Sequence, residues 1–273
     1  MRLTELDLAL VMNAAMPRLG LEPRGYRRLK GTLSKRLSRR MAELGLRTGR
    51  DYLARLEADP GELAAFDALC RMSISRFYRD GAVFDELRRL HLPRLAANAR
   101  KAGRQRLAAW SAGCASGEEA YSLAVLWRFG LQSAHPELQL DILATDADEQ
   151  LLARARNARY AAATLRELPA EWRARAFEMD GALLGLRAPL MSMVRLEVRD
   201  LRDSAPDAIF DLVLCRNAAF TYFRASLQQR FAERVWSVLA TGGALVIGAR
   251  ESLPDSAARG WTNPSPGIYL KPS

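Results

Sequence analysis

The chain has 273 residues, of which 49% are hydrophobic and 26% charged, a composition typical of a globular protein with one large core domain and room for a small one. Its formal net charge is +10. A basic balance of this size leaves nucleic acid, an anionic membrane surface and an acidic protein open as partners.

Cysteine usage and hydropathy limit the compartment and the class of protein. Three scattered cysteines without a C-x-x-C spacing and only two histidines give no basis for a zinc, redox or metal site. The chain contains no apolar run near the roughly 20 residues that a membrane helix needs, and its start lacks the pattern of a signal peptide. We therefore expect a cytoplasmic protein that does not insert into a membrane.

The first 72 residues are predicted to form a small helical domain. Residues 4–7 have the form of a capping box and begin a first helix. Apolar residues recur every three to four positions over residues 25–44, up to a glycine, which predicts a second helix. Two shorter helices are expected near residues 51–57 and 62–70.

The second of these helices carries a basic face opposite its apolar one. This face is either an ordinary solvated surface or a docking surface for an acidic helix or strand. Aromatic side chains are not interleaved with the cations, so nucleic acid is not expected as a partner. The basic residues, which outnumber the single Glu43, are Arg24, Arg27, Arg28, Lys35, Arg36, Arg39 and Arg40.

Residues 73–100 are predicted to link the helical domain to the rest of the chain. They comprise the segment SISRFYRD at residues 73–80 and a helix whose apolar residues lead up to Pro93. Arg79 taken alone is compatible with a surface salt bridge.

A glycine-rich turn between a strand and a helix follows. Residues 107–110 suit a central strand and residues 120–129 carry apolar residues at helical spacing, so Gly113 and Gly117 fall in the turn between them. Sheets of the α/β class bind ligands at such turns, and free amides at the helix start would favour an anionic or electron-rich group. The alternative is that the glycines only make a tight turn.

A second apolar strand over residues 140–144 leads to Asp146. A carboxylate at this place in a doubly wound fold can accept hydrogen bonds from both ribose hydroxyls of a cofactor. The interval from Gly113 to Asp146 exceeds the roughly 20 residues of dinucleotide folds, which disfavours a nicotinamide cofactor. Asp148 is expected to cap the next helix.

The remaining residues predict further α/β structure. Residues 155–177 have a helical pattern interrupted at Pro169. Two short strands at residues 183–187 and 193–198 flank Pro189 and are expected to pair as a hairpin. The other expected elements are a strand at residues 209–214, a helix at residues 227–239, and strands at residues 244–247 and 267–270, the last closing the sheet.

Four segments of the chain form one collinear pattern. They are SISRFYRD at residues 73–80, AWSAGCASGEE at residues 109–119, LATDAD at residues 143–148 and LCRN at residues 214–217. Together they resemble the chemotaxis-type (CheR) protein-glutamate methyltransferases, which use S-adenosylmethionine, and the resemblance spans nearly the whole chain.

The resemblance implies an α/β fold of the class I methyltransferase type. This fold has a doubly wound, Rossmann-like, mostly parallel sheet with an antiparallel edge strand, a small α-helical N-terminal domain and a small β-hairpin insertion. The implied domains are the helical domain at residues 1–72, the linker at 73–100 and the methyltransferase domain at 101–273, with the hairpin at 181–199.

The resemblance also implies the cofactor and its site. S-adenosyl-L-methionine is the expected cofactor and S-adenosyl-L-homocysteine its product, with Asp146 on the ribose. Arg79 and Tyr222 are the expected catalytic residues, which would orient carboxylates. The residues expected to bind the cofactor are Ser73, Ser75, Arg79, Ala112, Gly113, Glu118, Asp146, Asp200, Leu201, Asn217 and Ala218.

The chain departs from the family pattern in two places. Ser73 and Ser75 stand where relatives have Asn and Thr, so a hydroxyl replaces the amide at residue 73 and the hydroxyl at residue 75 is kept. Residues 217–223, NAAFTYF, are one residue longer than the usual Asn-Val-Leu-Ile-Tyr-Phe, so the register of Tyr222 can differ from that of the family.

The resemblance favours methyl transfer to glutamate side chains of an acidic protein, such as a chemoreceptor methylation helix, by a monomeric enzyme. A glutamate with a pKa near 4.3 is ionised at pH 7, so this reaction needs no general base, and the lack of a Ser-His-Asp arrangement agrees with it. Two alternatives stay open: the same chemistry on another protein or a small molecule, and a non-catalytic adaptor that binds the cofactor. The presence of Arg79 and Asp146 disfavours the adaptor. The hairpin is either a structural cover or, as in some relatives, a strand that captures a receptor peptide.

Overall fold

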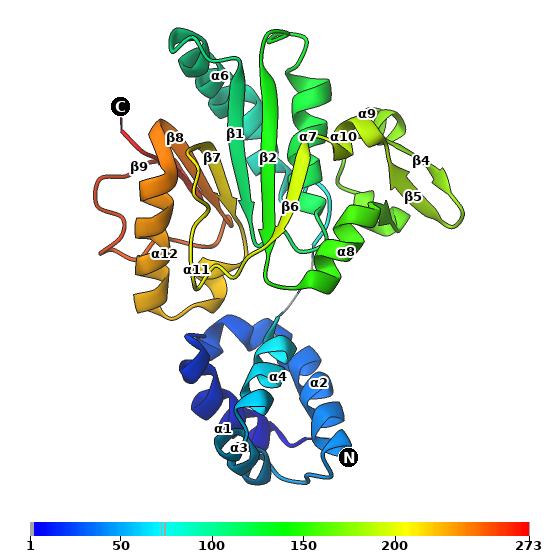
Figure 1. Ribbon diagram of the computed structural model, residues 1–273, viewed down its shortest axis with the longest axis vertical. Helices are drawn as coiled ribbons and strands as arrows, with labels where there is room; N and C mark the ends of the chain where they lie inside the picture. The colour runs from blue at the N-terminus through cyan, green and yellow to red at the C-terminus, as the bar shows by residue number, and fades with distance from the viewer. Residues whose placement is uncertain (1–2, 72, 74, 273) are drawn as a thin grey trace. The chain divides into compact units, whose positions relative to one another are not determined.

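The computed structural model describes residues 3–71, 73 and 75–272 and divides the chain into two compact units (Figure 1). The first unit contains the residues up to Ser73 together with the later segment Thr221–Gln228. The second contains Ile74–Phe220 and Gln229–Ser273. The domain boundary predicted at residue 72 lies outside the described residues.

The first unit is helical, as predicted. Its elements are α1 (Glu5–Ala15), the 3-10 turns η1 (Met16–Leu19) and η2 (Pro23–Leu29), α2 (Lys30–Glu43), α3 (Gly49–Ala58) and α4 (Pro60–Cys70). Thr4 caps α1, because its hydroxyl accepts a hydrogen bond from the Asp7 amide at 3.1 Å. Leu33, Leu37 and Met41 of α2 are fully buried, so the predicted apolar face is confirmed.

Residues 221–228 complete this unit although they lie far along the chain. The ring of Tyr222 lies 4.8 Å from the ring of Tyr26. Gly25 approaches the backbone of Thr221 so closely that a Cβ at residue 25 would lie 2.2 Å from the Thr221 carbonyl oxygen. A residue with a side chain would push this segment away, so glycine is required here.

The second unit is built on a seven-stranded sheet. Its strands are β1 (Arg106–Ala112), β2 (Gln139–Asp146), β6 (Val194–Val198), β7 (Phe210–Cys215), β8 (Leu239–Ile247), β9 (Thr262–Ser265) and β10 (Ile268–Leu270). Their order is β6-β2-β1-β7-β8-β10-β9; the first five are parallel, β10 is antiparallel to β8, and β9 is antiparallel to β10. The predicted doubly wound, mostly parallel sheet is confirmed, but β9 and not the strand near residues 267–270 forms the edge.

Helices cover both faces of this sheet (Figure 1). They include α5 (Gly81–Glu86), the π-helical turn η3 (Leu87–His91), α6 (Leu92–Lys101), α7 (Glu118–Gly130), α8 (Glu149–Asn157), α11 (Ala219–Tyr222) and α12 (Ala225–Val238). Leu107 and Ala109 of β1 pack in one cluster with α6 and α7, whereas Trp110 faces Phe231 of α12 at 6.1 Å. Adjacent residues of β1 thus bury opposite faces. None of the described helices combines the length and the hydrophobicity needed to cross a bilayer.

The helix predicted to lead up to Pro93 does not end there. The chain passes through η3 directly into α6, and Pro93 falls in the first turn of α6. The first turn tolerates proline because its N–H groups have no intrahelical acceptor.

A second, three-stranded sheet corrects the predicted hairpin. Its strands are β3 (Arg159–Tyr160), β5 (Leu183–Leu186) and β4 (Phe177–Asp180), in that order. Strands exist near both predicted positions, but the prediction that they pair with each other is wrong, because β5 pairs with β4 and β6 pairs with β2. The short helix α10 (Ala188–Met191), which contains Pro189, separates β5 from β6, so the chain changes sheets there.

The stretch predicted as helical at residues 155–177 contains more than helix. It holds β3 as well as η4 (Ala162–Leu165) and α9 (Ala170–Ala176), with Pro169 immediately before α9. Tyr160 of β3 is buried and its ring packs edge-on against Phe77, which explains why this part of the segment is not a solvated helix.

Candidate functional site

The loop between β1 and α7 has the backbone conformation that its glycines predict. Gly113 and Gly117 have φ values of 80° and 89°, and Ala115 between them also has a positive φ of 50°. The amides of Gly113 and Cys114 both donate to the Thr145 carbonyl, at 2.8 and 2.9 Å. These two amides are therefore engaged inside the loop. The expectation of ligand-binding amides concerned the start of α7, which begins at Glu118, and it stays a prediction.

Asp146 lies at the end of β2 and fastens this loop. Its Oδ2 accepts a hydrogen bond from the Ala115 amide and its Oδ1 one from the Asp148 amide, each at 2.9 Å. That Asp146 also accepts hydrogen bonds from the ribose hydroxyls stays a prediction. Asp148 caps α8, as predicted, since its side chain accepts from two amides of the first turn.

Two residues predicted to lie around the adenine come together with the loop. A Cβ placed on Gly113 would lie 3.0 Å from the Ala218 Cβ and 3.6 Å from the Leu201 Cδ1. Ala112, the last residue of β1, directly precedes Gly113 and is fully buried. Asp200 is held by Arg202, whose Nε donates to Asp200 Oδ1 at 2.9 Å.

Asn217 follows β7 in a left-handed conformation with φ 55°. Glu251, which the sequence analysis did not select, holds it there, because Glu251 Oε2 accepts from the amides of Asn217 and Gly248 at 2.9 and 2.6 Å. Within the described part of the chain, Asn217 Oδ1 is buried and has no hydrogen-bond partner. This oxygen is suited to a donor on a ligand.

Glu118 begins α7 and is only 3% exposed. Burial raises the pKa of its carboxyl, and hydrogen bonds from Ser75 and Ser116 only partly oppose this rise. Its Oε2 is buried without a partner among the described residues. The structure thus brings Ser75 to Glu118, as expected for neighbours in one site, and leaves a second buried acceptor.

These two acceptors fit the predicted cofactor. S-adenosylmethionine carries an adenine amino group and a methionine ammonium group, both of which donate hydrogen bonds. Asn217 Oδ1 and Glu118 Oε2 lack donors among residues 75–272. A buried acceptor left without a donor costs about 1–3 kcal/mol, which a bound donor would recover.

A buried ion network adjoins the site at Arg79. Arg216 lies at the end of β7 with a side chain only 3% exposed, and Glu119 lies 3.6 Å from its Nη1. Burial raises the pKa of Glu119, while Arg216, a hydrogen bond from Ser111 and Arg79 oppose the rise in that order.

The sequence analysis did not select Arg216 or Glu119 as site residues. Both lie inside segments of the collinear pattern, and that position is the signal that could have found them.

Ser73 and Tyr222 belong to the first unit. Tyr222 is the last residue of α11. Their contribution to the cofactor site stays a prediction.

The basic face of the first unit is only partly available for docking. Arg36 donates to the carbonyls of Leu69 and Arg71 at 3.1 and 2.7 Å, and Arg40 pairs with the buried Glu62 at 2.6 Å. These two arginines fasten α2 to α4, so assigning them to a docking surface is wrong. The exposed members of the set are Arg24, Arg27, Arg28, Lys35 and Arg39.

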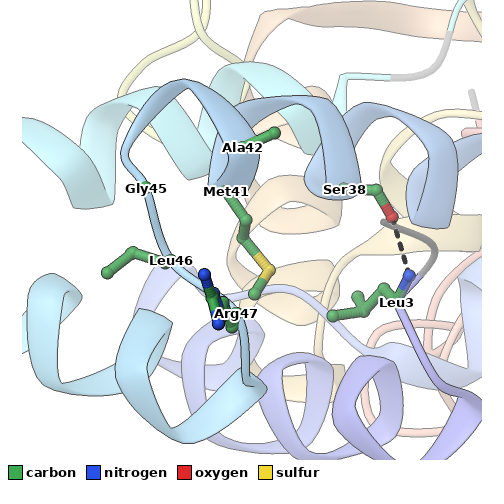
Figure 2. A pocket seen from close by; sticks show the side chains of 7 residues that line it. All are labelled: Leu3, Ser38, Met41, Ala42, Gly45, Leu46 and Arg47. Atoms are coloured by element: carbon green, nitrogen blue, oxygen red, sulfur yellow. Dashed lines mark hydrogen bonds between the residues drawn. The ribbon is translucent and has the colours of Figure 1, made fainter.

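Two hollows lie along α2, and the larger one is lined by Lys35 of this set. The smaller, of about 260 Å³, is lined mainly by apolar atoms of Leu3, Met41 and Leu46, with the Leu3 amide donating to Ser38 Oγ (Figure 2). The larger, of about 1120 Å³, shares Leu3 and Ser38 with the first. Its other lining residues are Glu5, Leu6, Leu8, Ala9, Lys30, Gly31, Ser34 and Lys35.

Family models match most of the chain. One described as "CheR methyltransferase, SAM binding domain" matches residues 73–265, and one described as "CheR methyltransferase, all-alpha domain" matches residues 23–68.

The chain is also similar to individual proteins. The chain is 31% identical to a chemotaxis protein methyltransferase of Listeria monocytogenes over 81% of each sequence. It is 32% identical, over 82% of its length, to a 104.1 kDa protein of Rhodobacter capsulatus, of which it spans only 23%. A solved structure, SAM-bound CalS10, an amino pentose methyltransferase from Micromonospora echinaspora, is 18% identical with a TM-score of 0.32, covering 64% of this chain and 58% of that one.

Proposed function

We propose that this chain, which belongs to the CheR family of S-adenosylmethionine-dependent methyltransferases, methylates glutamate side chains of a chemoreceptor-like protein. As a member of that family it is an enzyme that binds S-adenosylmethionine. The name of the Listeria relative supports a chemotaxis acceptor. The observation that carries the choice of an acidic protein is the exposed cationic surface beside the larger hollow of the first unit, which has both apolar and polar lining residues.

The chemistry of a carboxylate acceptor suits the residues present. When bound, the cofactor supplies an electrophilic methyl group on a sulfonium. A glutamate side chain is already ionised at pH 7, so the chain has to align and desolvate it and need not remove a proton. We assign the alignment to Arg79, because a guanidinium can hold a carboxylate through two parallel hydrogen bonds.

The acceptor-binding surface that we propose combines charge with apolar contact. Lys30 and Lys35 line the larger hollow opposite Leu6, whose side chain is exposed. An amphipathic acidic helix presents apolar residues on one side and carboxylates beside them, and it therefore matches both parts of this surface. Chemoreceptor methylation helices have this chemistry, whereas a small-molecule acceptor is too small to contact the whole of this surface.

The test of this function is the chemical nature of the methylated product. The purified chain is incubated with S-adenosylmethionine labelled in its methyl group and a chemoreceptor cytoplasmic fragment. We expect label on the fragment that mild base releases as methanol, because a glutamyl methyl ester is labile to base. A fragment with its methylated glutamates replaced by alanine is the control and should stay unlabelled. Base-stable label, or label only on small molecules, would contradict the proposal.

The docking surface gives a second expected result. The double variant Lys35→Glu and Arg39→Glu should lower kcat/KM for the acidic acceptor by about tenfold, with a weaker dependence on salt, because steering by opposite charge is lost. The affinity for S-adenosylhomocysteine should not change. Lys101→Glu, an exposed reversal at the end of α6 in the second unit, is the matched control. An unchanged rate and salt dependence in the double variant would mean that this face is only solvated.

A further inference from the structure

The segment that carries Arg79 has a conformation that its sequence does not favour. Tyr78 and Asp80 have φ values of 55° and 56°, in the left-handed region where residues with a side chain are disfavoured. Hydrogen bonds hold the first part of the segment, since the Phe77 amide donates to the Thr164 carbonyl at 3.0 Å and the Tyr78 amide to Ser122 Oγ at 2.8 Å. The Arg79 end needs a restraint of its own.

Arg216 supplies that restraint. Its Nη2 donates to the carbonyl oxygen of Arg79 at 2.6 Å and to Asp80 Oδ2 at 2.7 Å. The same guanidinium nitrogen thus binds the backbone carbonyl of Arg79 and the side chain of Asp80. Both hydrogen bonds restrain these two residues and so fix the backbone position from which the Arg79 side chain extends.

Arg216 is itself firmly placed. It follows directly on β7, its side chain is 3% exposed, and its guanidinium carbon lies 5.2 Å from the centre of the Phe84 ring. Glu119 of α7 lies 3.6 Å from the other terminal nitrogen and compensates part of the buried charge. Two elements of the sheet domain therefore fix the group that holds the segment.

We infer that Arg216 is a positioning residue for methyl transfer, which acts by fixing the backbone of Arg79 and touches neither substrate nor cofactor. This inference rests on the proposed role of Arg79. A lysine at residue 216 would keep the charge but lose the planar fork, and it could not reach the Arg79 carbonyl, Asp80 and Glu119 from one rigid group. The Arg79 side chain would then sample positions away from the reactive one, and displacement by about an ångström can cost on the order of a hundredfold in rate.

The test is a double-mutant cycle. Arg79→Lys first shows which quantity Arg79 controls, the dissociation constant of S-adenosylhomocysteine or kcat for the labelled methyl transfer described above, and we expect a change of about tenfold. Arg216→Lys should impair the same quantity by about fivefold to tenfold. The double variant should be about as impaired as Arg79→Lys alone, because two residues that act through one contact are not additive.

Arg94→Lys is the matched control. Arg94 also lies in the second unit and donates to a backbone carbonyl, that of Gly242, at 2.6 Å, but it has no part in the site. It should leave both quantities unchanged even if it lowers the unfolding temperature as much as Arg216→Lys does. A purely structural role of Arg216 would make the two variants behave alike.

Asp80→Asn keeps the inference testable if Arg216→Lys does not fold. Asparagine tolerates the left-handed backbone and keeps an acceptor, but it removes the charge that pairs with Arg216. We expect about a threefold loss in the same quantity, again without further loss in the Arg79→Lys background.

The outcomes separate the two hypotheses. Losses that multiply in the double variants would overturn the positioning role while leaving Arg79 in the site. A silent Arg79→Lys would overturn both, because Arg216 would then have nothing to position.

Discussion

Asp146→Ala should weaken the binding of S-adenosylhomocysteine by about a hundredfold. Hydrogen bonds to a charged group contribute about 1.5–3 kcal/mol each, so losing two to the ribose corresponds to roughly 3 kcal/mol, and about 1.4 kcal/mol is a factor of ten. The variant also releases the Ala115 amide from Asp146 Oδ2, which frees the loop that carries Gly113. Titration calorimetry measures the dissociation constant directly.

Neighbouring substitutions make this result specific. Asp146→Asn keeps one acceptor oxygen and should lose only about tenfold in affinity. Asp148→Ala removes the cap of α8 two residues away and should cost about 1 kcal/mol of stability with little change in affinity. If Asp146→Ala binds as tightly as the unchanged chain, the ribose assignment is wrong. NAD should bind to none of these proteins.

Glu118→Gln should weaken cofactor binding by about tenfold while making the cofactor-free protein more stable. The partnerless Glu118 Oε2 is the acceptor that we assign to a charged amino donor of the cofactor, and a charge-assisted bond of this kind contributes about 1.5–3 kcal/mol. Without the cofactor, the same carboxylate is buried at a cost. Removing the charge should therefore raise the free energy of unfolding by about 1 kcal/mol, or roughly 2–4 °C in unfolding temperature.

The pH dependence of the stability gain in Glu118→Gln shows whether the buried charge of Glu118 causes that gain. Burial raises the pKa of Glu118 in the folded state above its ordinary value of 4.5. The folded state then binds the proton more tightly than the unfolded state, so this group favours folding fully below about pH 4.5 and loses that contribution as the pH rises through the raised value. The stability gain of Glu118→Gln should be present at pH 7 and fade in acid. Equal unfolding temperatures at pH 7 together with unchanged affinity would contradict the assignment of Glu118.

Periodicity and capping predicted the first unit well because its information is local. Leu33, Leu37 and Met41 recur at helical spacing and are buried, and Thr4 caps α1 with a residue three positions away. The same local reading located β1, β2 and the turn at Gly113. Local patterns contain the period of an element and its caps, and they predicted these elements correctly, whereas they failed at residues 155–177 and at Pro93.

Long-range partners were outside the reach of that reading. The helical pattern of α2 shows Arg36 and Arg40 as part of a basic face, but their acceptors lie 33 to 35 and 22 residues further along the chain. The strand β5 has an apolar pattern that fits β4 as well as β6, so pairing could not be chosen from it. Arg216 and Glu251 bind backbone groups that the sheet brings near them. Every residue has the same backbone groups, so the sequence does not show which of them a side chain will bind.

The discontinuity of the first unit has a consequence for how the chain is made. Residues up to Ser73 leave the ribosome before the segment Thr221–Gln228 that completes their unit, which follows only after roughly 150 further residues. At about 5–20 residues per second, that interval lasts roughly 8–30 s. During this time Tyr26 lacks its contact with the ring of Tyr222, and Gly25 lacks its contact with the backbone of Thr221. The nascent chain therefore exposes an unfinished helical unit during this interval, and chaperones that bind apolar surface have access to it there.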